Sequence, residues 1–279
     1  MTKRKGHEMA AIDKNSIEKN LLAWFQIEGS HDIKDDGTID VTGTCKIRTD
    51  HPEGSKLPFR FGNVTDEFNI GAGGLISLQG CPSTVGHIFI AINNPLTSLQ
   101  GLSRISDLDF DGSIINLANC KLGNLSGMQW ARNMDVSHNP GLKSLQGMPD
   151  HDLCQIEAVG CNLKDLQGCP TKCRHLDITN QLSPMGSLEG LPSRLQSLSV
   201  DDNAPMLKLL EVLWGTKADR ANEATFKSYL KKNIRINGDQ KKADDIMTLV
   251  AELYKDRHDG IPAFALDLIK LGYRQNAHF

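Results

Sequence analysis

Two short motifs alternate along the middle of this chain at intervals of about twenty residues, and this repetition limits the possible folds more than any other feature. The first motif is an aliphatic stretch ending at a turn residue, as in Leu153-x-x-Ile156-x-Ala158-x-x-Cys161. The second is Leu-x-x-Leu-x-Gly, which follows the turn, as in residues 163–168. Such a period is typical of a solenoid, in which each coil buries its aliphatic side chains against the next coil.

The turn residues define a register for the repeats. Asn93, for example, has Ile90 and Ile88 three and five residues before it. The longest interval follows Asn93 and predicts an insertion at about residues 103–111. The pattern predicts short, irregular leucine-rich repeats, in which an Asn side chain at the turn bonds the backbone of neighbouring coils. The turn positions in this register are Gly73, Asn93, Cys120, Asn139, Cys161, Gln181 and Asn203.

The sequence therefore predicts an α/β solenoid in three parts. Residues 1–63 form a tail and a capping segment, with a helix over about 16–28 that begins at Ser16 and a strand containing Ile39 and Val41 after a turn at Asp36-Gly37. Residues 64–204 form the repeats. A cap is expected because the outermost coil of a solenoid would otherwise expose its core.

Residues 205–279 differ in composition and predict a helical module. Phe226, Leu230 and Ile234 recur at helical spacing, and Pro262 is suited to the first turn of a last helix. This part is more basic than the rest of the chain, with Lys231-Lys232 and Lys241-Lys242 as its densest charges. We favour a solvated face over a nucleic-acid contact here, since the whole chain has a net charge of −3.

The seven cysteines raise the question of a metal site, because several of them and His175 lie close together in the sequence. In the repeat register, however, Cys120 and Cys161 occupy turn positions, and Cys173 is equivalent to Val85 and Leu153. We therefore interpret them as small core residues and expect neither a metal nor a cofactor. The sequence shows neither a signal peptide nor an apolar run long enough for a membrane span.

One face of the predicted strands carries acidic side chains on consecutive coils. Alternation places every second residue outward, and the outward position four residues before the turn is acidic at Asp135, Glu157 and Asp177. We hypothesise that these residues form an acidic stripe for a protein with a basic surface; the alternative is that a solenoid simply keeps its open face charged. The full candidate set adds His175, Asp201 and Asn116, with Phe89, Ile114 and Val159 as apolar anchors.

Four segments resemble leucine-rich-repeat proteins of tailed bacteriophages, chiefly myoviruses. They are Asp35-Asp-Gly-Thr-Ile-Asp-Val-Thr-Gly43, residues 57–64, Leu75-Ile-Ser-Leu-Gln-Gly-Cys-Pro82 and residues 268–277. The resemblance implies phage origin and an interaction role, with no activity attached. It places the chain in the host cytoplasm, where it would act on a host factor, or in the virion as a structural component.

One segment of the repeats also resembles an enzyme family. Residues 191–203 look like repeats of bacterial effector ubiquitin ligases, which carry a catalytic Cys in the helical domain after the repeats. The last Cys of this chain is Cys173, within the repeats, so that nucleophile is missing. We therefore expect no enzyme. The partner's identity and the oligomeric state are not specified by the sequence.

Overall fold

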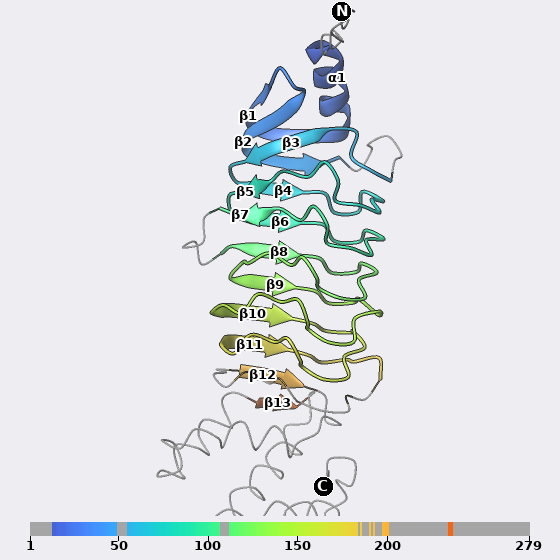
Figure 1. Ribbon diagram of the computed structural model, residues 1–279, viewed down its shortest axis with the longest axis vertical. Helices are drawn as coiled ribbons and strands as arrows, with labels where there is room; N and C mark the ends of the chain where they lie inside the picture. Colours follow the sequence, from blue (N-terminus) through green and yellow to red (C-terminus); the bar gives the residue numbers. More distant parts are fainter. Residues whose placement is uncertain are drawn as a thin grey trace, which may run out of the picture.

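The computed structural model describes residues 13–48, 55–106, 112–183, 185, 190, 192, 197–200 and 234–236, and it shows a parallel β-solenoid of about six turns with little helix. Its strands stack in parallel rungs along the length of the solenoid (Figure 1). The elements are α1 (Lys14–Trp24), β1 (Phe25–Ile33), β2 (Thr38–Ile47), β3 (Arg60–Val64), β4 (Glu67–Asn69), β5 (Thr84–Val85), β6 (Ile88–Ile90), β7 (Arg104–Ile105), β8 (Ile114–Asn116), β9 (Asn133–Asp135), β10 (Leu153–Glu157), β11 (Cys173–Asp177), β12 (Ser197–Val200) and β13 (Ile234–Ile236).

A helix and an antiparallel hairpin close the N-terminal end of the solenoid (Figure 1). The expected helix over 16–28 is wrong at both ends, since α1 spans Lys14–Trp24 and its cap is Asp13, whose Oδ1 accepts from the Ser16 N–H. The chain leaves the helix at Phe25 because this residue pairs with Ile47 in the hairpin and packs its ring among other aromatic rings. The expected turn at Asp36-Gly37 and the strand through Ile39 and Val41 are confirmed.

Strand β2 connects this cap to the repeats, because it pairs with two strands at once. Its first half runs beside β3 and its second half beside β4. Two ladders therefore start from β2: a short one through β3, β5 and β7, and a long one from β4 to β13. The segment of the expected insertion, at about residues 103–111, contains β7, and residues 107–111 of it lie outside the described part of the chain.

The inward side chains of the long ladder form one continuous core. The central inward position is filled on successive rungs by a large apolar side chain that is 0–1% exposed. Burying a side chain of this size stabilises a fold by about 1.5–3 kcal/mol, so each coil depends on its neighbours for most of its stability. These residues, paired in register, are Phe68, Phe89, Ile115, Met134, Ile156 and Leu176.

A column of turn residues joins each coil to the coil before it. The Asn139 side chain donates to the carbonyl oxygens of Leu117 (3.0 Å) and Val136 (2.9 Å) and accepts from the Leu122 N–H (2.9 Å). Asn94 makes the equivalent set of three bonds two coils earlier in this column, at 2.8–3.1 Å. The bonding of a turn Asn to neighbouring coils is therefore confirmed, and all these groups are buried.

Sulfur and a longer amide take the same position on other coils. The Cys120 thiol donates to the Ala91 carbonyl oxygen (3.4 Å) and the Cys161 thiol to that of Val136 (3.3 Å). The Gln181 amide donates to the Ala158 carbonyl oxygen (2.8 Å). Both cysteines are buried, as expected for small core residues.

The return loops repeat a tight turn at each Leu-x-Gly. At Leu166-Gln-Gly168, for example, the Cys169 N–H donates to the Leu166 carbonyl oxygen (2.9 Å) and Gly168 has a φ of +85°. A glycine is required there, because a Cβ at Gly168 would lie 2.4 Å from the Gln146 Cα atom of the preceding coil. The glycine of the second motif thus allows consecutive loops to pack in contact.

The solenoid extends further along the chain than the sequence indicated. Strand β13 pairs in parallel with β12, so Ile234 lies in a strand and not in the expected helix. Sheet pairing to Leu198 here overrides the helical spacing of the apolar residues. The rest of the expected helical module, within 205–279, lies outside the described residues. Among the described helices, none has the length and apolar character to cross a membrane.

Replacing Asn139 tests whether the turn column holds the coils together. Asn139→Ala should lower the free energy of unfolding by at least about 2 kcal/mol, because the Leu122 N–H and the Leu117 carbonyl oxygen lose their partner inside the protein. Asn139→Cys should cost clearly less, because cysteine donates to the preceding coil at the equivalent positions of Cys120 and Cys161. Urea denaturation followed by circular dichroism measures both. Equal losses for the two variants would contradict this role.

Candidate binding face of the sheet

The outward side chains of the long ladder form a regular column, set by the strand pairing. Residues on either side of the buried central position point away from the core, because side chains alternate along a strand. The column on the C-terminal side of the core residue reads, from β2 to β12, Lys46, Asn69, Ile90, Asn116, Asp135, Glu157, Asp177 and Ser199. This column contains the acidic stripe that the sequence predicted.

One predicted anchor is wrong, because the sequence register slipped by one residue at β6. Phe89 is 0% exposed and pairs with the buried Phe68 and Ile115, so it belongs to the core. The turn residue of this coil is Asn94, not Asn93; Asn93 has the positive φ found one residue before the turn on other coils, as at Asn119. Two adjacent asparagines made the choice ambiguous in the sequence.

Three carboxylates lie side by side in the column, and we call Asp135, Glu157 and Asp177 the carboxylate row. They occupy paired positions on β9, β10 and β11, so neighbouring members are one strand spacing apart, about 4.8 Å. In the described part of the chain, no Lys, Arg or His lies within ion-pair distance of any of them. Like charges placed opposite one another on neighbouring strands are destabilising.

Glu157 bears most of this repulsion, since it has a charged neighbour on each side. Burial, followed by the charges of Asp135 and Asp177, raises the pKa of the Glu157 carboxyl above its ordinary value. A hydrogen bond from the Gln155 amide to Glu157 opposes this effect only in part. The free energy needed to ionise Glu157 is therefore larger in the folded protein than in an unfolded chain.

The two aspartates of the row also have a structural role. Asp135 Oδ1 accepts from the Ser137 N–H (2.9 Å) and Asp177 Oδ1 accepts from the Thr179 N–H (3.0 Å), which fixes the backbone as each strand ends. Asn69 and Asn116 make the same bond at 3.0 Å to the N–H two residues later. An uncharged amide thus satisfies this turn, so the fold needs the acceptor oxygen but not the negative charge.

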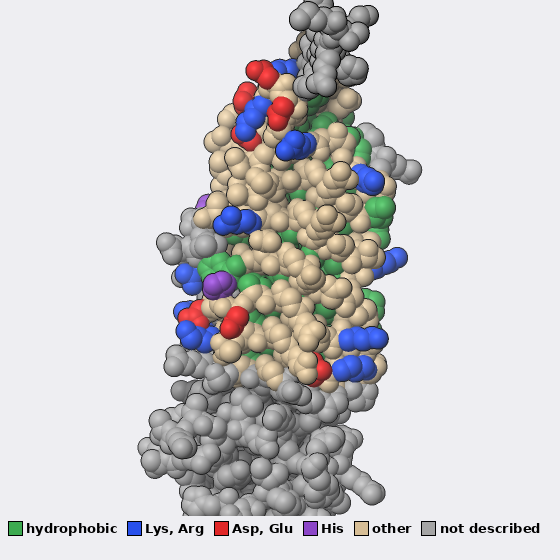
Figure 2. Space-filling model, viewed as in Figure 1, with side chains coloured by type: hydrophobic (Ala, Val, Ile, Leu, Met, Phe, Trp, Pro, Cys, Tyr) green, Lys and Arg blue, Asp and Glu red, His purple; other side chains and the backbone are tan. Residues whose placement is uncertain are grey.

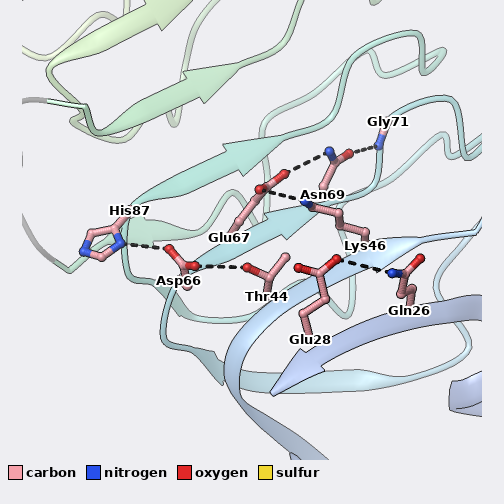
Figure 3. Close-up of polar contacts among 9 residues, drawn as sticks. All are labelled: Gln26, Glu28, Thr44, Lys46, Asp66, Glu67, Asn69, Gly71 and His87. Atoms are coloured by element: carbon pink, nitrogen blue, oxygen red, sulfur yellow. Dashed lines mark hydrogen bonds and ion pairs between the residues drawn. The ribbon is translucent and has the colours of Figure 1, made fainter. Parts of the chain in front are cut away.

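At the N-terminal end of the same face, by contrast, the carboxylate is paired. Glu67 accepts from Asn69 Nδ2 (3.1 Å) and lies 3.3 Å from Lys46 Nζ, as Figure 3 shows. Close to it, Asp66 accepts from Thr44 Oγ1 (3.0 Å) and contacts His87 Nδ1 (2.9 Å). The bond with His87, followed in size by that with Thr44, lowers the pKa of Asp66 despite partial burial. Glu67 and Asp66 thus each have a basic partner, which the described residues do not supply to the carboxylate row.

Beside the carboxylate row lies an apolar area of which the sequence predicted only Ile114, and we call Ile88, Ile90, Ile92 and Ile114 the isoleucine patch. All four are partly exposed, and Ile88 pairs directly with Ile114. A side chain on Gly71 would meet Ile92 at 2.9 Å, so the glycine leaves room for it. The signal was present in residues 88–92, Ile-Phe-Ile-Ala-Ile, which are apolar at every position, including those that face outward.

The remaining predicted residues are distributed as follows. Asn116 lies between the isoleucine patch and the carboxylate row in the outward column, and Ile114 belongs to the patch itself. His175 is exposed and pairs with Gln155 beside the row, while Val159 is partly exposed two residues after Glu157. Asp201 lies outside the described residues. The structure thus brings most of the predicted set onto one face and removes Phe89 from it.

Other charged side chains lie mainly at the edges of the stack, and some of them are paired. Figure 2 shows charged side chains gathered near the two edges of the stack, with mainly uncharged surface between them. At the edge where β10 and β11 begin, Lys172 lies 3.2 Å from Asp152, and Asp150 accepts from the Thr171 N–H (3.0 Å). These residues line a shallow cleft of about 450 Å³ together with Trp130. Its carboxylates already have partners, unlike those of the row.

The cysteines and acidic residues do not assemble into a metal centre in the described part of the chain. Across those residues, no group of three or more His, Cys, Asp or Glu side chains is arranged to hold a metal ion. Burial raises the pKa of the Cys161 thiol to about 11, which keeps it protonated at neutral pH. Cys169 is likewise a free thiol, and burial raises its pKa well above the ordinary value.

Comparisons with protein-family models, curated proteins and solved structures find no match to this chain.

Replacing Glu157 measures the repulsion within the carboxylate row. Because its folded-state pKa is raised, the ionised carboxyl destabilises the fold above that pKa, and this penalty disappears as protonation sets in at lower pH. Glu157→Gln should therefore raise the free energy of unfolding at pH 7 by about 0.2–1 kcal/mol, with the gain shrinking toward pH 4. Urea denaturation at the two pH values measures this.

Glu28→Gln is the matched control, because Glu28 is an exposed strand residue that also accepts from a glutamine two residues before it. It lies opposite Thr44 and has no carboxylate on the paired strand position. Its substitution should leave stability unchanged at both pH values. A loss of stability in Glu157→Gln at pH 7 would show that the row is not under repulsion.

Proposed function

We propose that this chain is a leucine-rich-repeat protein that binds another protein through the outward face of strands β6 to β11, without catalysing a reaction. The observation that carries the proposal is the carboxylate row, three ionisable groups without counter-charges in the described chain, placed next to the isoleucine patch. Exposed apolar area bordered by charge is a common composition of protein-binding surfaces.

The energetic argument is that the fold gains nothing from the charge. Asn69 and Asn116 show that an amide makes the same turn bond as Asp135 and Asp177. Retaining carboxylates on three successive strands costs stability, as the raised pKa of Glu157 indicates. Functional sites are where such local costs are expected, and a basic partner would turn the repulsion into attraction.

A catalytic role for the same carboxylates is the weaker alternative. General acid–base catalysis by a carboxyl pair depends on two different environments facing one substrate bond. Here the three groups point the same way from neighbouring strands of one sheet. Their arrangement favours contact with a surface carrying several positive charges.

The partner proposed is a protein with a basic surface. The resemblance to phage proteins supports a host factor as that partner, with the chain acting in the host cytoplasm. The same resemblance supports a second role, as a structural component of the virion. The two roles differ in a simple observable, because a component of the virion is present in purified particles.

The test is affinity capture from host and infected-cell lysates with the row neutralised. Asp135→Asn/Glu157→Gln/Asp177→Asn removes three charges and retains the oxygen acceptors that the turns need. The control Glu28→Gln/Asp32→Asn/Asp35→Asn removes three charges from exposed residues near the N-terminal hairpin. We expect wild type and the control to capture the same partner, and the row variant to capture at least about tenfold less of it. Removing charged contacts at the centre of an interface weakens binding by about 2 kcal/mol or more.

Equal capture by all three proteins would overturn the strand face as the binding surface. Capture of phage structural proteins alone, together with the chain's presence in purified particles, would replace the host-factor role by the virion role.

A further inference from the structure

We propose that the face binds an amphipathic α-helix of the partner, lying along the stack of coils, with apolar residues over the isoleucine patch and Lys or Arg over the carboxylate row. This inference rests on the proposed function and adds the shape and charge pattern of the partner segment. It follows from the order and spacing of the outward column, which reads Ile90, Asn116, Asp135, Glu157 and Asp177 on five consecutive rungs.

The spacing of the rungs matches a helix and not an extended strand. Successive rungs are about 4.8 Å apart, so the row from Asp135 to Asp177 spans about 9.6 Å. Residues i and i+7 on one side of an α-helix are about 10.5 Å apart, with i+3 or i+4 between them. Alternate residues of an extended strand are about 6.6–6.8 Å apart, so three of them span about 13 Å and drift out of register with the carboxylates.

The length of the face sets the length of the helix. From Ile90 to Asp177 there are four rung spacings, or about 19 Å, which corresponds to about 13 residues of helix. A helix of this length is marginal in isolation, so the partner segment would belong to a folded protein or become helical on binding.

The distribution of charge along the face sets the composition of the helix. The isoleucine patch offers apolar contact to one end of it, while the other end meets the three carboxylates of the row. Beyond the patch, Lys46 and Glu67 already neutralise each other, so this pair offers a partner less unmatched charge than the row does. A helix with its charges evenly distributed would leave a cation over the isoleucines, at a desolvation cost. The matching segment is therefore apolar in one half and basic in the other, on a single stripe.

The experiment uses designed peptides as probes and the full chain. The helical probe is an Ala-rich peptide of about 20 residues with three Leu in its first half and three Lys spaced i, i+3 and i+7 in its second half, all on one stripe. The extended probe has the same Leu and Lys content, with Lys at every second position and Pro residues that prevent a helix. Fluorescence anisotropy measures the dissociation constant of each.

The protein variants copy residues that the fold already accepts in this column. Ile90→Asn places on β6 the residue found at Asn69 and Asn116, and Asp135→Asn/Asp177→Asn does the same on the row. Circular dichroism confirms that each variant remains folded. We expect the helical probe to bind wild type at least about tenfold more tightly than the extended probe does, and either variant to weaken it by about tenfold or more.

Equal affinity of the two probes, no binding of either, or full affinity of the helical probe for Ile90→Asn would overturn the helix inference. These outcomes are separate from the proposed function. If capture of a cellular partner depends on the carboxylate row but the protein binds the helical and extended probes equally, the helix inference is wrong and the proposed function stands. If capture of the cellular partner does not change when the row is neutralised, both the proposed function and the helix inference are wrong.

Discussion

The structure depends on side-chain amides that connect the backbone of one coil to the next. Asn94 and Asn139 each bond carbonyl oxygens of two consecutive coils and an N–H of the earlier return loop. A short coil cannot supply these partners from its own backbone, because its turn and loop are not regular secondary structure. The apolar core holds the coils in contact, and this column fixes the position of each turn relative to the next.

Because the core and the turns hold the coils together, the outward face is available for other uses. Two of its aspartates are tied to the backbone through one oxygen, in a bond that Asn makes equally well elsewhere in the same column. The charge on these residues is therefore separable from the fold. Because the coils repeat the same geometry, side chains at equivalent positions of successive coils lie in a line along the stack. Three carboxylates therefore lie on adjacent strands.

Much of this organisation was predictable, because both motifs have a direct physical meaning. Aliphatic residues at alternate positions gave the strands, and each Leu-x-Gly gave a turn whose glycine has positive φ. The error at Phe89 arose because Asn93 and Asn94 both suit a turn, and a one-residue slip reverses which side chains face outward. The paired strand β8 settles the choice, since Phe89 lies opposite the buried Ile115.

Other errors came from pairings between distant residues. Helical spacing favoured a helix through Gln26 and Ile27, but these residues lie opposite Lys46 and Cys45 in the hairpin. Ile234 fitted a helical stripe and joins β12 instead. Ile88 and Ile90 were not predicted to face outward, because the one-residue register error assigned them to the core. In each case the partner strand, which local periodicity does not reveal, decides the outcome.

The most direct measurement of the central claim, that the outward face is the binding surface, is hydroxyl-radical footprinting of the captured complex against the free chain. The account predicts lower side-chain oxidation at Ile88, Ile90 and His175 in the complex, with Ile76 and Leu182 unchanged. Those two side chains are 50% and 61% exposed and lie in the return loops, away from the strand face. Protection of Ile76 and Leu182 with unchanged oxidation at Ile90 and His175 would contradict the account and place the binding surface on the loops.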